Sequence, residues 1–178
     1  MAIEIVPVER RHLDGLRARM HDFFHRRFSK NPALVAILES HTQKTTEHYF
    51  DKAKDAIDNP KTIFLLALEG DRIVGFTVGA HAPEVEGTAE SYYTCSMKEQ
   101  RGRRGTGIGG PLLEKKIEIM LQGGAKRIRM EPLHGISARM IRNVGQKFGL
   151  RVTGGKTMTQ WYLTKVKKRK SKIGRAHV

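Results

Sequence analysis

The 178-residue sequence is poor in cysteine and acidic residues, and it has no long apolar run. Its one cysteine, Cys95, has no partner for a disulfide within the chain, which favours a reducing compartment. No segment reaches the roughly 20 apolar residues of a membrane-spanning helix, and the first residues lack the apolar core of a signal peptide. We therefore expect a cytoplasmic protein without a membrane segment.

Metal-ligand motifs are also missing from the sequence. His21 and His25 are four residues apart, so both would lie on one face of a predicted helix, but no motif supplies a third ligand. We interpret this pair as part of a solvated basic face and predict no metal site.

Basic residues outnumber acidic ones by 33 to 18, and the formal net charge is +15. Much of the excess lies in a terminal run without acids, and the remaining chain is still basic, which suits a polyanionic partner. We expect residues 1–166 to form one domain and residues 167–178 to be a disordered basic tail, whose last letters, KIGRAHV, look non-native. Nucleic-acid binding by this tail is the less favoured alternative.

The hydrophobic pattern predicts alternating strands and helices without repeats or linkers. The expected strands are 3–8, 62–68, 72–79, 90–98, 127–131 and two C-terminal strands joined at Gly154 and Gly155. The expected helices are 9–28, 33–58 as one helix or two short ones, 112–121 and 137–148. Ile37 is expected to face the core, and Ser137 to cap the last helix. Because strands 62–68 and 72–79 are apolar throughout, helices should cover both faces of the sheet.

A glycine-rich stretch precedes the third long helix. Four glycines follow Arg103 and Arg104 in KEQRGRRGTGIGGPLLEKKIEIML, residues 98–121. Glycine lets a ligand approach the backbone, and a helix N-terminus offers free N–H groups and a positive dipole end. Guanidinium groups suit a pyrophosphate. The stretch therefore predicts a phosphate-binding loop.

Two other interpretations fit the glycines alone. Gly105, Gly107 and Gly110 satisfy G-x-G-x-x-G, with Glu131 downstream as in a dinucleotide-binding fingerprint. That fingerprint requires a buried strand directly before its first glycine, whereas residues 98–104 are highly charged. A nicotinamide-dependent dehydrogenase is therefore disfavoured. The second alternative is a glycine-rich surface turn.

The segment Arg104 to Gly109 has the form R-x-x-G-x-G and resembles motif A of the GCN5-related N-acetyltransferases, the GNAT superfamily. The predicted hairpin upstream, with Glu69-Gly70-Asp71 followed by Ile73-Val74-Gly75-Phe76, also resembles this family. The resemblance covers roughly residues 3–166. It implies an α/β fold with a mixed, mostly antiparallel sheet of about seven strands, helices on both faces, and a splay between strands 4 and 5.

The resemblance also implies a reaction, in which an acetyl group passes from acetyl-CoA to a primary amine by direct attack in a ternary complex. Backbone groups of the fourth strand would pair with the cofactor, one of them polarising the thioester carbonyl, and the glycine loop would hold the pyrophosphate. The implied cofactor-binding residues are Met97, Lys98, Glu99, Arg103, Arg104, Gly105, Thr106, Gly107, Ile108, Gly109, Gly110 and Ser137.

Candidate catalytic groups follow from the needs of that reaction. An ammonium acceptor must lose a proton, and Glu99 and Glu131 are ranked ahead of Glu90 as the base. Where the family has a general-acid tyrosine this sequence has Gly145, so either His134, Tyr92 or Tyr93 donates the proton in its place, with His134 closest along the chain to the splayed strand, or the thiolate leaves unassisted. The departure also leaves open a catalytically weak, GNAT-like binding module for coenzyme A or nucleic acid.

The acceptor is either a small-molecule amine or a protein or peptide amine, and a homodimer is compatible with the sequence. Acidic residues of the first helices and of the loop before the fourth strand are expected to attract a cationic acceptor, although lysines and a histidine lie among them. These acids are Glu39, Glu47, Asp51, Glu84, Glu86 and Glu90.

Overall fold

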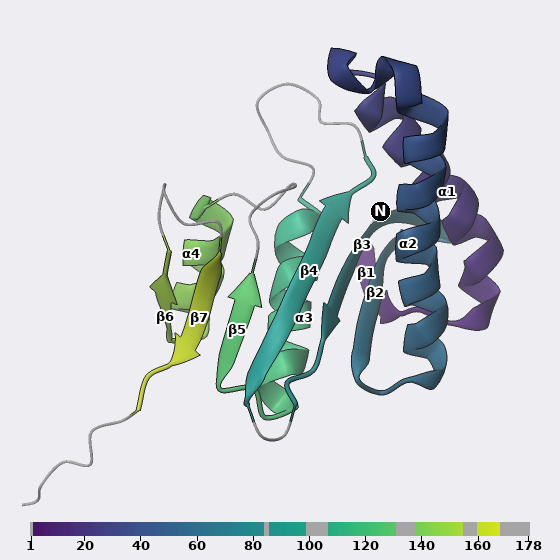
Figure 1. Cartoon of the computed structure of the whole chain (residues 1–178). Helices are drawn as coiled ribbons and strands as arrows, with labels where there is room; N and C mark the ends of the chain where they lie inside the picture. The colour runs from purple at the N-terminus through teal and green to yellow at the C-terminus, as the bar shows by residue number, and fades with distance from the viewer. Residues whose placement is uncertain (1, 84–85, 99–106, 131–137, 155–159, 168–178) are drawn as a thin grey trace, which may run out of the picture.

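The computed structural model describes residues 2–83, 86–98, 107–130, 138–154 and 160–167. These residues form one seven-stranded sheet with α-helices on both of its faces (Figure 1). The strands are β1 Ile3–Pro7, β2 Thr62–Glu69, β3 Arg72–Ala80, β4 Thr88–Ser96, β5 Arg127–Met130, β6 Leu150–Thr153 and β7 Trp161–Lys165. The helices are α1 Leu13–Phe28, α2 Leu38–Asp58, α3 Gly109–Gln122 and α4 Ala138–Lys147, with 3-10 helices at Arg10–His12 and Pro32–Ile37.

The strand order is β1-β2-β3-β4-β5-β7-β6. Only β4 and β5 are parallel neighbours among the described strands, and every other pair is antiparallel. The mixed, mostly antiparallel sheet predicted from the sequence is therefore confirmed.

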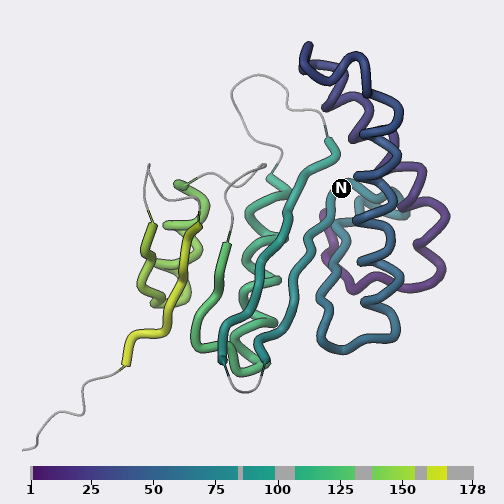
Figure 2. Tube along the Cα trace, in the orientation of Figure 1, coloured from purple at the N-terminus to yellow at the C-terminus, as the bar shows by residue number. Residues whose placement is uncertain are grey.

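Helices α1 and α2 pack on one face of the sheet, and α3 and α4 pack on the other (Figures 1 and 2). Leu16, Met20 and Phe24 of α1 are buried against the first face together with Phe76 of β3. On the second face, Leu112 of α3 belongs to a separate buried cluster. The apolar β2 and β3 contribute to both clusters because alternate side chains point to opposite faces.

One residue that the sequence predicts in the core is exposed. Ile37 was expected in the core, but its side chain is 50% exposed. The segment Pro32–Ile37 forms a 3-10 helix whose residues are not buried, and α2 begins only at Leu38. A 3-10 helix has a different side-chain period from an α-helix, so the α-helical stripe does not extend back through this segment.

The pairing of β4 with β5 is short. β5 lies beside β4 from Thr88 to Ser91, where Met130 is the last paired residue of β5. β4 continues to Ser96, and Figure 1 shows its upper end running beyond the end of β5. Within the described residues, the far half of β4 therefore has β3 on one edge and no strand on the other. No helix among the described residues is long and apolar enough to span a membrane.

Candidate functional site

The N-terminus of α3 begins at the end of the glycine-rich stretch. Ile108 is the N-cap residue, and its apolar side chain makes no capping hydrogen bond to this helix end. The first turn of α3 has no acidic residue. Because the first N–H groups of a helix have no partner within it, this end is electropositive and able to bind an anion.

Two glycines leave the backbone at this helix end accessible. Gly107 has a φ of +71°, a conformation that favours glycine, and a Cβ built there would meet no atom within 4 Å. Gly110, in the first turn of α3, is equally open, while a Cβ on Gly109 would lie 3.5 Å from Met140 Cε. Among the described residues, no side chain therefore blocks the approach of a ligand phosphate to the backbone at Gly107 and Gly110.

Ile108 anchors the loop end to the sheet. Its side chain is buried and lies over β3 at Gly75, where a Cβ would be only 2.7 Å from Ile108 Cγ2. Leu112, one turn further along α3, would lie 3.1 Å from the same Cβ. The absence of a side chain at Gly75 therefore lets the start of α3 approach the sheet closely, which fixes the helix N-terminus in place.

At the end of β4, one hydrogen bond shows which backbone N–H groups point to β3 and which point to the opposite edge. The Met97 N–H donates to Val74 O on β3 at 2.8 Å, and the Met97 side chain is buried under α1 and α2. Consecutive strand residues direct their N–H groups to opposite edges. Ser96 therefore directs its N–H to the edge that lies away from β3. Sequence reasoning missed Ser96 because the sequence does not reveal which edge of the strand a given N–H faces.

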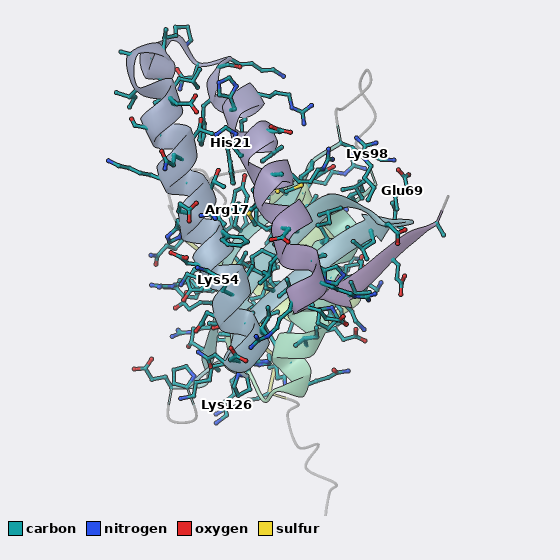
Figure 3. All side chains as sticks on the ribbon, turned by 90° about the vertical axis from the view of Figure 1, so that its right-hand side faces the viewer. Arg17, His21, Lys54, Glu69, Lys98 and Lys126 are labelled. Carbon is teal, nitrogen blue, oxygen red and sulfur yellow. The ribbon has the colours of Figure 1, made fainter. Side chains whose placement is uncertain are left out.

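Lys98 follows directly after this strand. Its N–H donates to Ser96 Oγ at 3.3 Å, and its Nζ lies 2.5 Å from Glu69 Oε1 at the end of β2. Figure 3 shows Lys98 and Glu69 at the same end of the sheet. The ion pair holds the chain as it leaves β4 for the glycine-rich stretch.

Several predicted residues lie outside the described part of the chain. They are the catalytic candidates Glu99, Glu131 and His134 and the cofactor-binding candidates Arg103, Arg104, Gly105, Thr106 and Ser137. Glu90, the remaining candidate base, lies on β4 opposite Arg129 of β5, and its Oε2 accepts a hydrogen bond from Arg129 Nε at 2.7 Å. Its carboxylate is thus paired with a guanidinium group.

Gly145 lies against the sheet. The residue is buried in α4, and a Cβ on it would be 2.4 Å from Val152 Cγ2 of β6. A larger residue at this position would require the Val152 side chain or its strand to shift. The local packing therefore favours glycine where the resemblance would place a tyrosine.

Cys95 and Tyr93 of β4 are buried under α1 and α2. Burial raises the pKa of the Cys95 thiol to about 12 and that of the Tyr49 phenol to about 12, and it raises the pKa of Tyr93 still further. The rings of Tyr49 and Tyr93 stack at 4.9 Å. These groups stay protonated at neutral pH, so Cys95 is a packing residue rather than a nucleophile.

Most of the acids expected to attract a cationic acceptor already face a basic group. Glu47 binds Arg17 between α1 and α2, Asp51 lies 3.0 Å from Lys54, and Glu39 lies beside His21 and His25 at 3.5 and 3.7 Å. Figure 3 labels three of the basic partners, Arg17, His21 and Lys54, on these two helices. Neighbouring cations therefore balance the charges of Glu47 and Asp51, whereas the histidines balance that of Glu39 only when they are protonated. This arrangement weakens the expectation of an acidic acceptor surface on these helices.

The fold resembles that of several solved acetyltransferases. PaiA N-acetyltransferase from Thermoplasma acidophilum, solved with coenzyme A, superposes with a TM-score of 0.63 at 18% identity, over 92% of this chain and 98% of that one. PH1933 from Pyrococcus horikoshii OT3 gives 0.58 at 19% identity, over 94% and 100%. An aminoglycoside 6′-acetyltransferase type Ii gives 0.56 at 14% identity, over 95% and 100%.

No curated protein sequence matches the chain. The family model described as "Acetyltransferase (GNAT) family" matches residues 18–145, which include the α3 N-terminus and the whole of β4. Acetyl-CoA is the co-substrate of this family. The match spans more than half of the 178 residues, and the chain therefore belongs to the GNAT acetyltransferase family.

Proposed function

We propose that this protein is an acetyl-CoA-dependent N-acetyltransferase that acts on a primary amine by direct attack in a ternary complex. The observation that carries the proposal is the juxtaposition of an uncapped, electropositive helix end at Gly107–Gly110 with the strand edge of β4 beyond Ser91. A diphosphate fits the N-terminus of α3, because its negative charge complements the electropositive helix end. An extended amide-containing arm fits the free edge of β4, where it can pair as a strand would.

In this proposal the N–H groups at the start of α3, together with Arg103 and Arg104, bind the pyrophosphate. Ser96 and the neighbouring backbone groups of β4 hold the arm along the strand edge. Bound acetyl-CoA supplies the activated acyl group. Glu99 or Glu131 removes a proton from the ammonium acceptor, and His134 donates one to the departing thiolate.

One observation favours the alternative, a binding module with little or no turnover. The sequence has Gly145 where the resemblance would place a tyrosine, and this glycine packs so closely on Val152 that a larger residue would displace the Val152 side chain or its strand. A thiolate is a tolerable leaving group because a thiol pKa near 8.5 is close to neutral. The loss of the acid therefore slows the reaction without forbidding it, and a turnover measurement separates the two functions.

Binding is tested with Gly107→Val and a matched control. Gly124, at the other end of α3, also has a positive φ (+92°) and open space around its missing Cβ. Both variants incur similar backbone strain, about 1–2 kcal/mol or more for a β-branched residue. Isothermal titration should show that Gly107→Val weakens acetyl-CoA binding at least about tenfold, whereas Gly124→Val binds as the wild type does. Absence of wild-type binding would refute the proposal.

Turnover is tested by following thiol release from acetyl-CoA over a panel of amines, including polyamines, aminoglycosides and peptides with free lysine or N-terminal amines. The proposal expects amine-dependent release that falls about 100-fold in either Glu99→Gln or Glu131→Gln, whichever is the base. Tight binding of acetyl-CoA without release for any amine would instead identify the binding module.

A further inference from the structure

A lysine is buried in the core between α3 and the sheet. Lys116 is 0% exposed, and it lies on the face of α3 that also buries Leu113, Ile117 and Met120. Burial lowers the pKa of its amine to about 7, with no charged neighbour as a further cause. Lysine is rarely buried to this extent, because moving an amine out of water is costly unless its hydrogen bonds are replaced.

Three acceptors on two strands replace those hydrogen bonds. Lys116 Nζ lies 3.1 Å from Val78 O, 3.2 Å from Tyr93 O and 3.0 Å from Thr94 Oγ1, so it donates to all three when protonated and to two of them when neutral. Thr77 Oγ1 lies 2.5 Å from Thr94 Oγ1 and donates to Tyr93 O at 3.0 Å. The amine thus links β3 and β4 through a network in which each polar atom has a partner.

This network lies at an irregularity in β4. Val78 is opposite Tyr93 and Gly79 is opposite Ser91, so Tyr92 is an extra residue that forms a β-bulge. Gly79 makes room for the lysine, since a Cβ there would lie 3.2 Å from Lys116 Cδ and 2.5 Å from Met120 Cε. The lysine chain therefore runs beneath the bulge through space that a side chain would fill.

The opposite face of the bulge contacts α2. Tyr93 stacks on Tyr49, and Lys52 Nζ lies 5.1 Å from the ring centroid of Tyr92. Two consecutive tyrosines thus contact residues three positions apart on one helix, as expected when a bulge turns both side chains toward the same face. The bulge is therefore held from both sides, by α2 on one and by Lys116 on the other.

The bulge lies where the pairing of β4 with β5 ends. Ser91 is the last residue of β4 beside β5, and Tyr92 is the extra residue. Thr94 and Ser96 follow, and the alternation that directs the Met97 N–H to β3 directs their N–H groups to the edge away from β3. A bulge bends the strand that carries it and increases its twist. Its geometry therefore sets the direction of the backbone that, in the proposed function, contacts the arm and thioester of the cofactor.

We propose that Lys116 is a positioning residue for acyl transfer: its amine fixes the bulge of β4 and so aligns the strand edge at Thr94 and Ser96 with the thioester. The inference rests on the proposed acetyl-CoA binding and adds a residue that acts through β4 without touching the cofactor. The hydrogen bonds to two main-chain carbonyls explain why the position holds an amine, although an apolar side chain would be buried at lower cost.

The test uses Lys116→Met, which keeps an unbranched chain of similar length but removes the donor. Two ligands separate the two parts of the site: acetyl-CoA, which contacts both, and 3′-phospho-ADP, its nucleotide portion, which contacts only the α3 N-terminus. Ile117→Val, at the next residue of α3 and also fully buried, perturbs the same core without reaching the bulge. Thr94→Val removes one acceptor of the amine and serves as a second, milder variant.

We expect Lys116→Met to bind 3′-phospho-ADP as the wild type does, to bind acetyl-CoA about tenfold more weakly, and to lose about 10- to 100-fold in kcat. Thr94→Val should show a smaller loss of the same kind, and Ile117→Val none. Equal weakening of both ligands in Lys116→Met, or an unchanged kcat and acetyl-CoA affinity, would overturn the positioning role. If the wild type binds 3′-phospho-ADP but not acetyl-CoA, the proposed function fails first and this inference falls with it.

Discussion

Lys116 should make the stability of the protein depend on pH in a way that a single substitution removes. Its pKa is lowered from 10.5 to about 7 in the folded chain. Between these values the unfolded chain binds a proton that the folded chain does not, so the free energy of unfolding rises with pH. The destabilisation is complete below pH 7 and vanishes above 10.5. Between pH 7 and 10.5 the free energy of unfolding rises by about 1.4 kcal/mol per pH unit. It therefore rises by about 2 kcal/mol between pH 6 and 8.5, nearly all of it above pH 7.

Urea and thermal unfolding of the wild type and of Lys116→Met at pH 6, 7 and 8.5 measure this contribution. The wild type should gain about 2 kcal/mol, or about 4–8 °C in Tm, relative to the variant across this range. Ile117→Val should keep the wild-type pH dependence. The range stops at pH 8.5 because, at higher pH, the single thiol of the unfolded chain ionises while Cys95 in the folded chain stays protonated. This raised pKa of Cys95 lowers the free energy of unfolding as pH rises, opposite to the effect of Lys116. Parallel stability profiles for wild type and Lys116→Met would refute the assignment of a neutral buried amine.

Three further predictions concern the surroundings of the site. Gly75→Val places a Cβ 2.7 Å from Ile108 Cγ2 and 2.8 Å from Cys95 O, so it should cost about 1–3 kcal/mol in urea unfolding and also weaken acetyl-CoA binding. Cys95 should react with iodoacetamide only after unfolding, which mass spectrometry with and without urea would show, because its thiol is buried. Glu90→Gln should change unfolding free energy by less than about 1 kcal/mol, since the pair with Arg129 is partly exposed.

Much of the architecture was predictable because its signals are local. The apolar runs of β2 and β3 around Gly70, and the helical stripes of α1 and α3, are patterns of a few consecutive residues. The sequence left open whether residues 33–58 form one helix or two, and it placed Ile37 in the core wrongly, because Pro32 can begin either an α-helix or a 3-10 helix. Packing against distant parts of the chain decides which of the two helix types forms, and the Ile37 side chain, which is half exposed, has little such packing.

The site was predictable only in part, for the same reason. The glycines at the start of α3 are recognisable from spacing, and Gly107 indeed has the positive φ that requires glycine. Lys116 looks in the sequence like one more charge on the solvent face of a helix. Its acceptors come from β3 and β4, which are remote in sequence, and the bulge that brings them together depends on pairing register. Such a contact has no local signal.

Helix α3 is the common reference for both halves of the proposed site. Its N-terminus is held against β3 where Gly75 lets Ile108 approach, and two turns later Lys116 binds the bulge of β4. The anion-binding end and the strand edge are thus attached to one rigid element. Because a helix rises about 1.5 Å per residue, their separation is set by the helix between them rather than by a loop. Changes at Lys116 should therefore move the strand edge relative to a phosphate site that stays fixed, which is why the two ligands are expected to respond differently.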